Sequence, residues 1–272
     1  MLTVTACYTY TTLNDKHVVA STKMSGSLFT FLMCSSMAVF LLFCLPFFEI
    51  KFVLSWQAFA AIILMVLCKL AELFMSAAIF KEMSAFELKA WIGVTLFVSY
   101  ATDIFYGEAF RIISLLFIVM TVVGLAFIVF SEKSEKPNYK KILIPLVLYL
   151  ASKYGYGLVV KAFDEYISST LLLFIALVII TVGLLPTLDR EEIKHNKKGS
   201  LMVVLARIPN TVGMLAENAV ALISLTSYSF IQPMILVTLF GIRIIRREDF
   251  TFKNILGGAM CIAGLILFQF LK

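Results

Sequence analysis

Long apolar runs separated by short polar connections set the pattern of this chain. A membrane-spanning helix needs about 20 mostly apolar residues, and the runs predict ten such helices. We expect them at roughly 2–20, 28–48, 54–79, 90–107, 111–130, 142–160, 168–188, 200–222, 226–245 and 254–271. A polar run at 131–141 divides the chain near its middle. The pattern therefore predicts an all-α integral membrane protein.

The first of these helices is unusually polar. Residues 2–20 are rich in Thr and end in the polar run 14–17. A helix of this kind is expected to face a cavity or other helices rather than lipid. The alternative is that the true start of the chain lies upstream of Met1. The N-terminal residues lack the pattern of a secretory signal peptide, so we expect no cleavage there.

Two stretches of the chain resemble each other at a shift of 140 residues. Residues 107–130 and 247–270 are identical at seven of 24 positions. The identical pairs are Glu108/Glu248, Phe110/Phe250, Leu116/Leu256, Met120/Met260, Gly124/Gly264, Leu125/Leu265 and Phe130/Phe270. The resemblance extends to Leu-Ala-Glu at 70–72 and at 215–217, where the shift is 145.

The internal repeat predicts how the chain is organised. We expect a first five-helix repeat at 1–130, a polar connection at 131–141 and a second five-helix repeat at 142–272. Because five is an odd number, the two repeats must cross the membrane in opposite senses. A duplicated, inverted membrane unit is typical of secondary transporters, whose substrate site lies between the halves.

Composition and charge agree with this class. The chain has 272 residues, is 61% hydrophobic and has a mean hydropathy of +0.97. A soluble domain could not bury so much apolar surface.

The net charge of +6 comes from Lys and Arg in short connections. This distribution is a signal of membrane topology rather than of nucleic-acid binding. Every second connection, starting with the first, is rich in Lys and Arg. Counted together with the adjoining helix ends, these five connections hold sixteen such residues, and the other four hold three. The positive-inside rule therefore predicts that the rich set is cytoplasmic and that both termini are outside. We expect the protein to lie in the plasma membrane.

Motifs for enzymatic or metal chemistry are absent from the sequence. There is no HExxH motif, no phosphate-binding glycine loop and no nucleophile elbow. The five cysteines are widely spaced in apolar runs, without metal-ligand or redox spacing. His17 and His195 both lie in polar connections. We therefore expect no enzymatic activity, no cofactor, no metal and no nucleic-acid partner.

Apart from the polar run 14–17 and the residues counted with the connections, six charged residues fall within the predicted helices, where contact with lipid is costly. They are Lys69, Glu72, Asp103, Lys153, Arg207 and Glu217. Lys69 and Glu72 are three residues apart and therefore share a helix face. They form either a self-neutralising pair that supports packing or a polar wall of a transport cavity.

The predicted helix at 200–222 carries a polar stripe at helical spacing. The stripe consists of Arg207, Asn210, Thr211, Met214, Glu217 and Asn218. Pro209 lies within it and leaves one backbone carbonyl without a donor. A hydrogen-bonded seam between helices is the alternative, but a full charge of each sign favours a cavity.

A lysine near the predicted membrane midplane marks a further polar segment. Lys153 lies about 12 residues into its helix, with Tyr154 and Tyr156 beside it. Close packing is the alternative for this segment, and for Asp103 the two interpretations balance. The predicted substrate-binding residues are Lys69, Glu72, Asp103, Lys153, Tyr154, Tyr156, Arg207, Asn210 and Glu217.

Glu217 is the predicted proton-coupling residue. A membrane carboxylate can carry a proton when it is desolvated and no fixed cation holds it ionised. Lys69 one turn away should keep Glu72 charged, whereas Arg207 lies about 15 Å from Glu217 along the helix axis. The prediction requires that Lys153 does not reach Glu217 in the fold. The competing hypothesis is that both glutamates are fixed ions and that transport is uncoupled.

The end of the chain resembles a known transporter family. Residues 231–268 contain a Pro within the ninth helix, a Glu after it and Gly residues seven apart in the last helix. The matching residues are Pro233, Glu248, Gly257 and Gly264. The motif resembles EamA-type proteins of the drug/metabolite transporter superfamily, which implies a layout of two five-helix repeats and transport of amino acids, sugars, nucleotide sugars, amines or drugs. In the first half, Phe117 stands where the first Gly would be. The glycines of the last helix, Gly258 among them, are expected to permit close packing.

Two functions fit these observations. The favoured hypothesis is a secondary transporter that moves a small polar metabolite by alternating access, and charges of both signs suggest an amino acid or amine derivative. The alternative is a flippase-like or accessory membrane protein that acts on lipid-linked precursors. A sensor would need a signalling domain, for which the chain has no room. The expected partners are a small-molecule substrate and the lipid bilayer, and the sequence fits a monomer or a homodimer.

Overall fold

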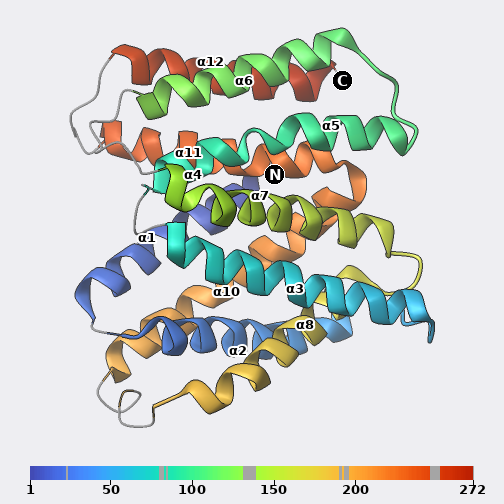
Figure 1. Ribbon diagram of the computed structural model, residues 1–272, viewed down its shortest axis with the longest axis vertical. Coiled ribbons are helices and arrows are strands. Elements are labelled where there is room, and N and C mark those ends of the chain that lie inside the picture. Colours follow the sequence, from blue (N-terminus) through green and yellow to red (C-terminus); the bar gives the residue numbers. More distant parts are fainter. Residues whose placement is uncertain are drawn as a thin grey trace.

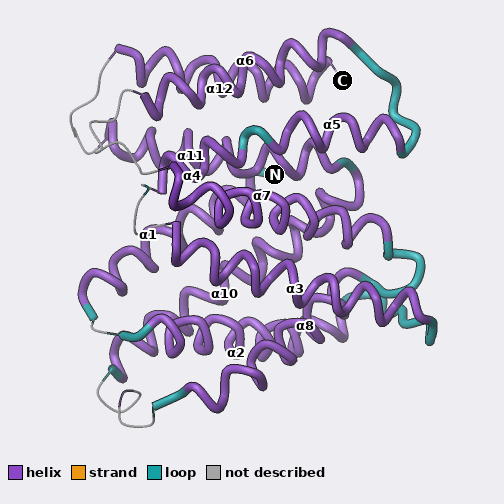
Figure 2. Tube along the Cα trace, in the orientation of Figure 1, coloured by secondary structure: helices purple, strands orange, loops and turns teal. Residues whose placement is uncertain are grey.

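The protein is built almost entirely from helices. A computed structural model describes residues 1–22, 24–79, 83, 85–130, 139–189, 192, 196–245 and 252–271. Within this part of the chain there is no β-strand, only an isolated bridge between Phe52 and Ile167. The predicted all-α class is therefore confirmed. Figure 1 shows the helices, and Figure 2 shows how little of the described trace is loop.

The helices follow one another along the chain with short connections. They are α1 (Leu2–Ser21), α2 (Gly26–Cys44), α3 (Trp56–Ile79), α4 (Ala85–Ile92), α5 (Thr95–Phe105), α6 (Ile112–Phe130), α7 (Tyr139–Ala162), α8 (Ser169–Leu184), α10 (Lys197–Ile223), α11 (Leu225–Ile245) and α12 (Phe252–Leu271). Single 3-10 turns, η1 (Leu45–Phe47) and η2 (Leu185–Thr187), extend α2 and α8.

The prediction of one continuous helix at 90–107 is wrong. The chain turns at Gly93 and Val94, whose N–H groups donate to the carbonyls of Ala90 and Trp91 at 2.9 and 3.0 Å, and α5 begins after the turn. A Cβ atom at Gly93 would overlap the side chain of Leu125 on α6. The missing side chain therefore lets the bend lie directly against α6.

Seven helices among the described residues are long and apolar enough to cross a membrane. They are α2 with η1, α3, α7, α8 with η2, α10, α11 and α12. The remaining helices are shorter or more polar. Large apolar side chains face outward, as at Phe47 and Phe105, while Asp103 and Arg207 are buried. This distribution of apolar and charged side chains is the opposite of that in a water-soluble protein, and it suits a lipid environment. The chain is therefore a multi-pass membrane protein.

The helices lie side by side in successive layers (Figure 1). One edge is formed by α6 packed on α12, and α5 packed on α11 lies next to it. The middle holds α3 against α7 and α1 against α10, and the opposite edge holds α2 against α8. Each layer thus combines helices from before and after the 131–141 connection.

Glycines allow the backbones of α6 and α12 to touch. A Cβ atom on Gly124 would lie 2.6 Å from the carbonyl oxygen of Gly257, and one on Gly257 would lie 2.5 Å from that of Gly124. A Cβ atom on Gly264 would overlap Thr121 of α6. The expected packing role is therefore confirmed for Gly257 and Gly264, whereas Gly258 stands at ordinary contact distance from its neighbour on α11.

The connections gather in two groups at opposite ends of the helices. The α2–α3 and α7–α8 connections meet where Ser168 N donates to Lys51 O at 3.0 Å. At the other end, Ser25 Oγ before α2 donates to a carboxylate oxygen of Glu192 before α10 at 2.8 Å. This grouping agrees with the two sets of connections that the Lys and Arg distribution separates.

Cysteine labelling tests which group is cytoplasmic. A cysteine at Asn196, or at Ser134, which lies outside the described residues, should not react with a membrane-impermeant thiol reagent added to intact cells. A cysteine at Lys51 should react, because its connection belongs to the group poor in Lys and Arg. All variants are made in a background without the five native cysteines. Labelling at Asn196 without labelling at Lys51 would reverse the orientation.

Candidate functional site

A cavity of about 210 Å³ lies among helices from both sides of the 131–141 connection. Its wall is formed by α1, α2 and α3 from the first half and by α7, α8, α10 and α11 from the second. The charged side chains on this wall are Asp15, Lys69, Glu72, Lys153, Arg207 and Glu217, and Asn210 lines it as well. The structure therefore brings together all of the predicted substrate-binding residues except Asp103, Tyr154 and Tyr156.

Two lysines share one carboxylate on the cavity wall. Lys69 Nζ lies 3.2 Å from Glu72 Oε2, and Lys153 Nζ of α7 pairs with Glu72 Oε1. Lys69 also lies over the ring of Tyr156, 4.2 Å from its centroid, a favourable cation–π distance. The helical i,i+3 pair expected on α3 is therefore present, and Lys153 extends it into a three-charge cluster that joins α3 to α7.

Glu217 has a different environment. Its Oε2 accepts a hydrogen bond from the Tyr8 hydroxyl of α1, and the side chain is almost fully buried. Among the described residues no Lys or Arg forms an ion pair with Glu217, since Lys153 pairs with Glu72 instead. Lys153 and Glu217 nevertheless line a second, water-sized cavity of about 10 Å³. Lys153 is thus near Glu217 but paired with Glu72, and the proton-coupling role of Glu217 stays a prediction.

Arg207 is paired across the cavity. Its Nη2 donates to Asp15 Oδ1 of α1, and its Nε donates to the carbonyl of Val203 at 3.2 Å. The side chain of Arg207 is 1% exposed and that of Asp15 is 23% exposed. This pair links α1 to α10, so Asp15, in the polar run at the end of the first helix, does face a partner inside the protein.

The cavity is more accessible at one end than at the other. Asp15 and Glu72 keep 23% and 19% of their side-chain surface exposed, and they lie in the last two turns of α1 and α3. Glu217 and Gln232, at the far end of the cavity, are 3% and 8% exposed. The open end therefore faces the connections that are rich in Lys and Arg.

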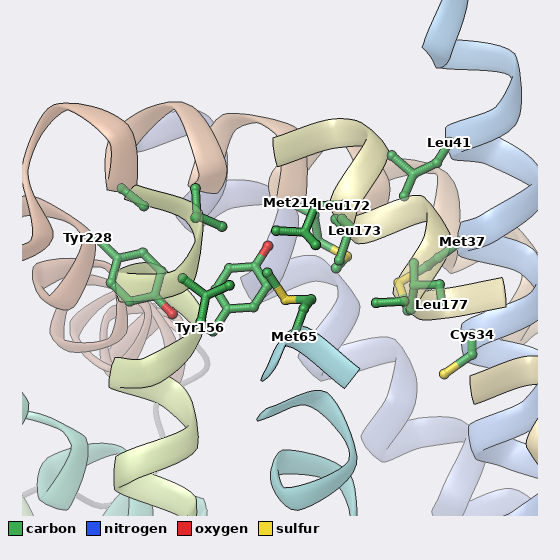
Figure 3. Close-up of a cluster of buried hydrophobic side chains, with 14 of the residues drawn as sticks. Cys34, Met37, Leu41, Met65, Tyr156, Leu172, Leu173, Leu177, Met214 and Tyr228 are labelled. Carbon is green, nitrogen blue, oxygen red and sulfur yellow. The ribbon is translucent and has the colours of Figure 1, made fainter. Parts of the chain in front are cut away.

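A stacked pair of aromatic rings lies behind the cavity wall. Tyr156 and Tyr228 stack with ring centroids 6.2 Å apart, and Figure 3 shows the two rings beside each other at the edge of the apolar cluster. The Tyr156 hydroxyl donates to Asn218 Oδ1, and the Tyr228 hydroxyl donates to the carbonyl of Lys153 at 2.9 Å. Tyr156 therefore supports the cavity from behind rather than lining it.

Asp103 serves the helix junction instead of the cavity. It is fully buried, and its carboxylate accepts hydrogen bonds from the N–H groups of Leu225 and Thr226 at 3.0 and 2.8 Å. The hydroxyls of Ser224 and Thr226 donate to it at 2.8 Å, and Lys161 Nζ lies 2.9 Å away. A carboxylate at a helix N-terminus is stabilised by the free N–H groups and the helix dipole. Asp103 thus caps α11 directly after the end of α10.

Tyr154 also lies away from the cavity. Its hydroxyl is 2.6 Å from Thr102 Oγ1 of α5, so it joins α7 to α5 near the Asp103 cap. Tyr154 and Asp103 were selected from the sequence because they are polar residues at membrane depth. The sequence could not tell that they bond to neighbouring helices instead of facing the space between the halves.

Several cavity residues were not selected from the sequence. They are Tyr8, Thr11, Thr12, Asp15, Tyr149 and Gln232. The polarity of residues 2–20 was a signal for the four residues on α1, because that helix was expected to face a cavity. Tyr149 carried a weaker signal, since it stands 141 residues after Tyr8. The pair Val159-Val160 likewise stands 141 residues after Val18-Val19.

No group of three or more potential metal ligands of the His, Cys, Asp and Glu types occurs in the part of the chain that the structure describes. His195 and the family-motif residue Glu248 lie outside that part. Comparison with protein-family models and with curated proteins finds no match to this chain.

Replacing Asp103 with Asn tests the capping role. The variant keeps the shape of the side chain but removes the charge shared by Lys161 and the α11 amides. Breaking a buried ion pair costs about 3–5 kcal/mol, so the midpoint of thermal unfolding in detergent should fall by on the order of 10 °C. Asp164→Asn, in the connection after α7, is the matched control and should shift the midpoint little. Equal shifts in the two variants would contradict the capping role.

Proposed function

We propose that this protein is a secondary transporter of the plasma membrane that moves a small polar metabolite by alternating access. The proposal includes ten membrane spans in two inverted five-helix repeats, at 1–130 and 142–272, as in the EamA-type family that the sequence resembles. The observation that carries it is the cavity between the halves, which holds Glu72 and Glu217, the same position of the two Leu-Ala-Glu segments. Duplicated transporters bind substrate at such an interface.

The packing of the helices supports two equivalent halves. If α1, α2, α3, α5 and α6 correspond to α7, α8, α10, α11 and α12, contacts in one half should recur in the other. Helix α3 packs on α7 as α10 packs on α1, and α3 packs on α8 as α10 packs on α2. The pairs α2–α8, α5–α11 and α6–α12 would then join equivalent helices. Both α2 and α8 end in a 3-10 turn that begins with Leu-Pro.

The contact between α6 and α12 supports inversion. A Cβ atom on Gly124 would lie 2.6 Å from the carbonyl oxygen of Gly257, and one on Gly264 would lie 2.8 Å from that of Phe117. The shift of 140 seen in the sequence makes Gly124 equivalent to Gly264, and Phe117 equivalent to Gly257. Replacing each residue of the first contact by its equivalent therefore gives the second contact. Residues later in α6 touch residues earlier in α12, so the two helices run antiparallel. Antiparallel equivalent helices are what an inverted repeat requires.

The state of the cavity supports alternating access. Its open end faces the connections rich in Lys and Arg, which the positive-inside rule assigns to the cytoplasm. Its other end is buried, since Glu217 and Gln232 there are only 3% and 8% exposed. A site open to one side and closed to the other corresponds to one of the two states of a transport cycle. The charges on its wall suit a small polar solute better than a lipid tail.

Uptake into proteoliposomes tests the transport function. The purified protein should concentrate at least one small polar compound from a pooled metabolite extract, measured by mass spectrometry against protein-free liposomes. Lys153→Gln should reduce this uptake at least tenfold, because it breaks the charge cluster on the cavity wall. The exposed-loop variant Lys51→Gln serves as the control and should behave as the parent. Movement of a labelled lipid-linked precursor, with no solute uptake, would favour the flippase-like alternative.

Glu217→Gln tests proton coupling. Glutamine keeps the size of the side chain and cannot exchange a proton, so proton-driven accumulation should be lost while substrate counterflow survives. Counterflow needs only alternating access and is measured without a proton gradient. If the variant accumulates substrate with the pH dependence of the parent protein, Glu217 is not the proton carrier. In that case uncoupled diffusion or exchange is the better description.

A further inference from the structure

The cavity offers more hydrogen-bond donors than its own acceptors use. Two ammonium groups carry three N–H donors each, and in the described structure the Glu72 carboxylate accepts one bond from Lys69 and one from Lys153. Both lysine side chains remain 13% exposed. The remaining donors are therefore available to a ligand in the cavity, and an acceptor-rich group such as a carboxylate suits them.

The charges on the wall balance only when Glu217 is ionised. Arg207 and Asp15 neutralise each other. Lys69, Lys153 and Glu72 together carry one positive charge in excess, and Glu217 supplies the single negative charge that offsets it. Protonation of Glu217 would leave the described wall with a net charge of about +1.

We propose that the cavity binds a small monocarboxylate at Lys69 and Lys153, and that Glu217 takes up a proton when the carboxylate binds. An anion placed beside ionised Glu217 would leave the site with an excess negative charge in a poorly solvated interior, which is costly. Neutral Glu217 removes that cost. Because coupling between two binding events is reciprocal, the anion favours the proton as much as the proton favours the anion.

This inference narrows the substrate class and rests on the proposed transport function for its consequence, symport of a proton with an organic anion. It favours a simple anion over the amino acid or amine derivative that the sequence suggested, because the ammonium group of either would need the ionised form of Glu217. A cavity of about 210 Å³ has the volume of roughly seven water molecules, enough for one small organic acid. A dianion would leave one negative charge without a partner.

In this proposal the proton taken up on binding goes to Glu217. The titratable and charged groups that face it are Tyr8 of α1, Lys69 and Glu72 of α3, Tyr149, Lys153 and Tyr156 of α7, and Tyr228 of α11. Glu72 is in contact with both lysines and serves as their anionic partner.

Calorimetric titration of the purified protein in detergent tests both parts of the proposal. The probes are butanoate, butanamide, butylammonium and 2-aminobutanoate, which have similar sizes and differ in charge. Butanoate should bind at least tenfold more tightly than the other three. Titration at pH 7 in two buffers with different ionisation enthalpies should show uptake of about one proton for each butanoate bound.

Variants separate the anion site from the proton site. Glu217→Gln should bind butanoate at least as tightly as the parent, without proton uptake. Lys153→Gln should weaken butanoate binding at least tenfold, while Lys51→Gln should not change it. Thermal unfolding of each variant identifies any that fails to fold, and Lys69→Gln then provides a second test of the anion site.

The outcomes distinguish this inference from the transport proposal. Absence of butanoate binding, tighter binding of butylammonium or 2-aminobutanoate, or unchanged proton uptake in Glu217→Gln would each overturn the inference. Uptake of a cation by proteoliposomes would overturn it and leave transport standing. Butanoate binding with proton uptake, but without movement of any solute across the membrane, would instead overturn the transport function.

Discussion

The pairing of Glu72 with two lysines is the interaction on which the cavity depends. A charge within a membrane protein is expensive unless it has a partner or faces water. Lys69 alone would neutralise Glu72 within α3, and the pair would then make no contact with another helix. Lys153 comes from α7, so the third charge turns a local pair into a link between the two halves of the chain. The cluster of two lysines and one glutamate then carries one positive charge in excess.

Buried charges serve two different purposes in this protein, and hydrogen bonding separates them. The Asp103 carboxylate receives two backbone amides, two hydroxyls and Lys161. The hydrogen-bonding capacity of the carboxylate is therefore filled, and Asp103 acts as a helix cap that fixes the start of α11 after the end of α10. The lysines at Glu72 keep donors to spare and face a cavity. Unsatisfied donors beside space for a ligand are the physical mark of a binding site.

The sequence predicted the helical class and most helix positions because apolar runs of membrane length are long and strongly marked. It missed the bend at Gly93, because one glycine in an apolar run gives no hint of the contact with Leu125 that the bend permits. It identified most of the charged cavity wall, since charge at membrane depth is rare. It could not predict that Asp103 caps α11 while Glu72 faces a cavity, because both are single acids in apolar helices. The difference arises from which helix end packs nearby.

Duplication alone would give a symmetric site, and the differences between the halves make this one unequal. In the proposed alignment Glu72 and Glu217 are equivalent, and so are Tyr149 and Tyr8. The neighbours differ: Lys69 aligns with Met214, and Lys153 aligns with Thr12 at the shift of 141. Both cations therefore pair with the first glutamate, whereas among the described residues the second accepts a hydrogen bond from a tyrosine hydroxyl and forms no ion pair. Under the proposed mechanism, one carboxylate stays ionised beside its lysines while its counterpart exchanges the proton. The scaffold could then stay two-fold while its chemistry becomes directional, since among the described residues the two lysines pair with only one of the two aligned acids.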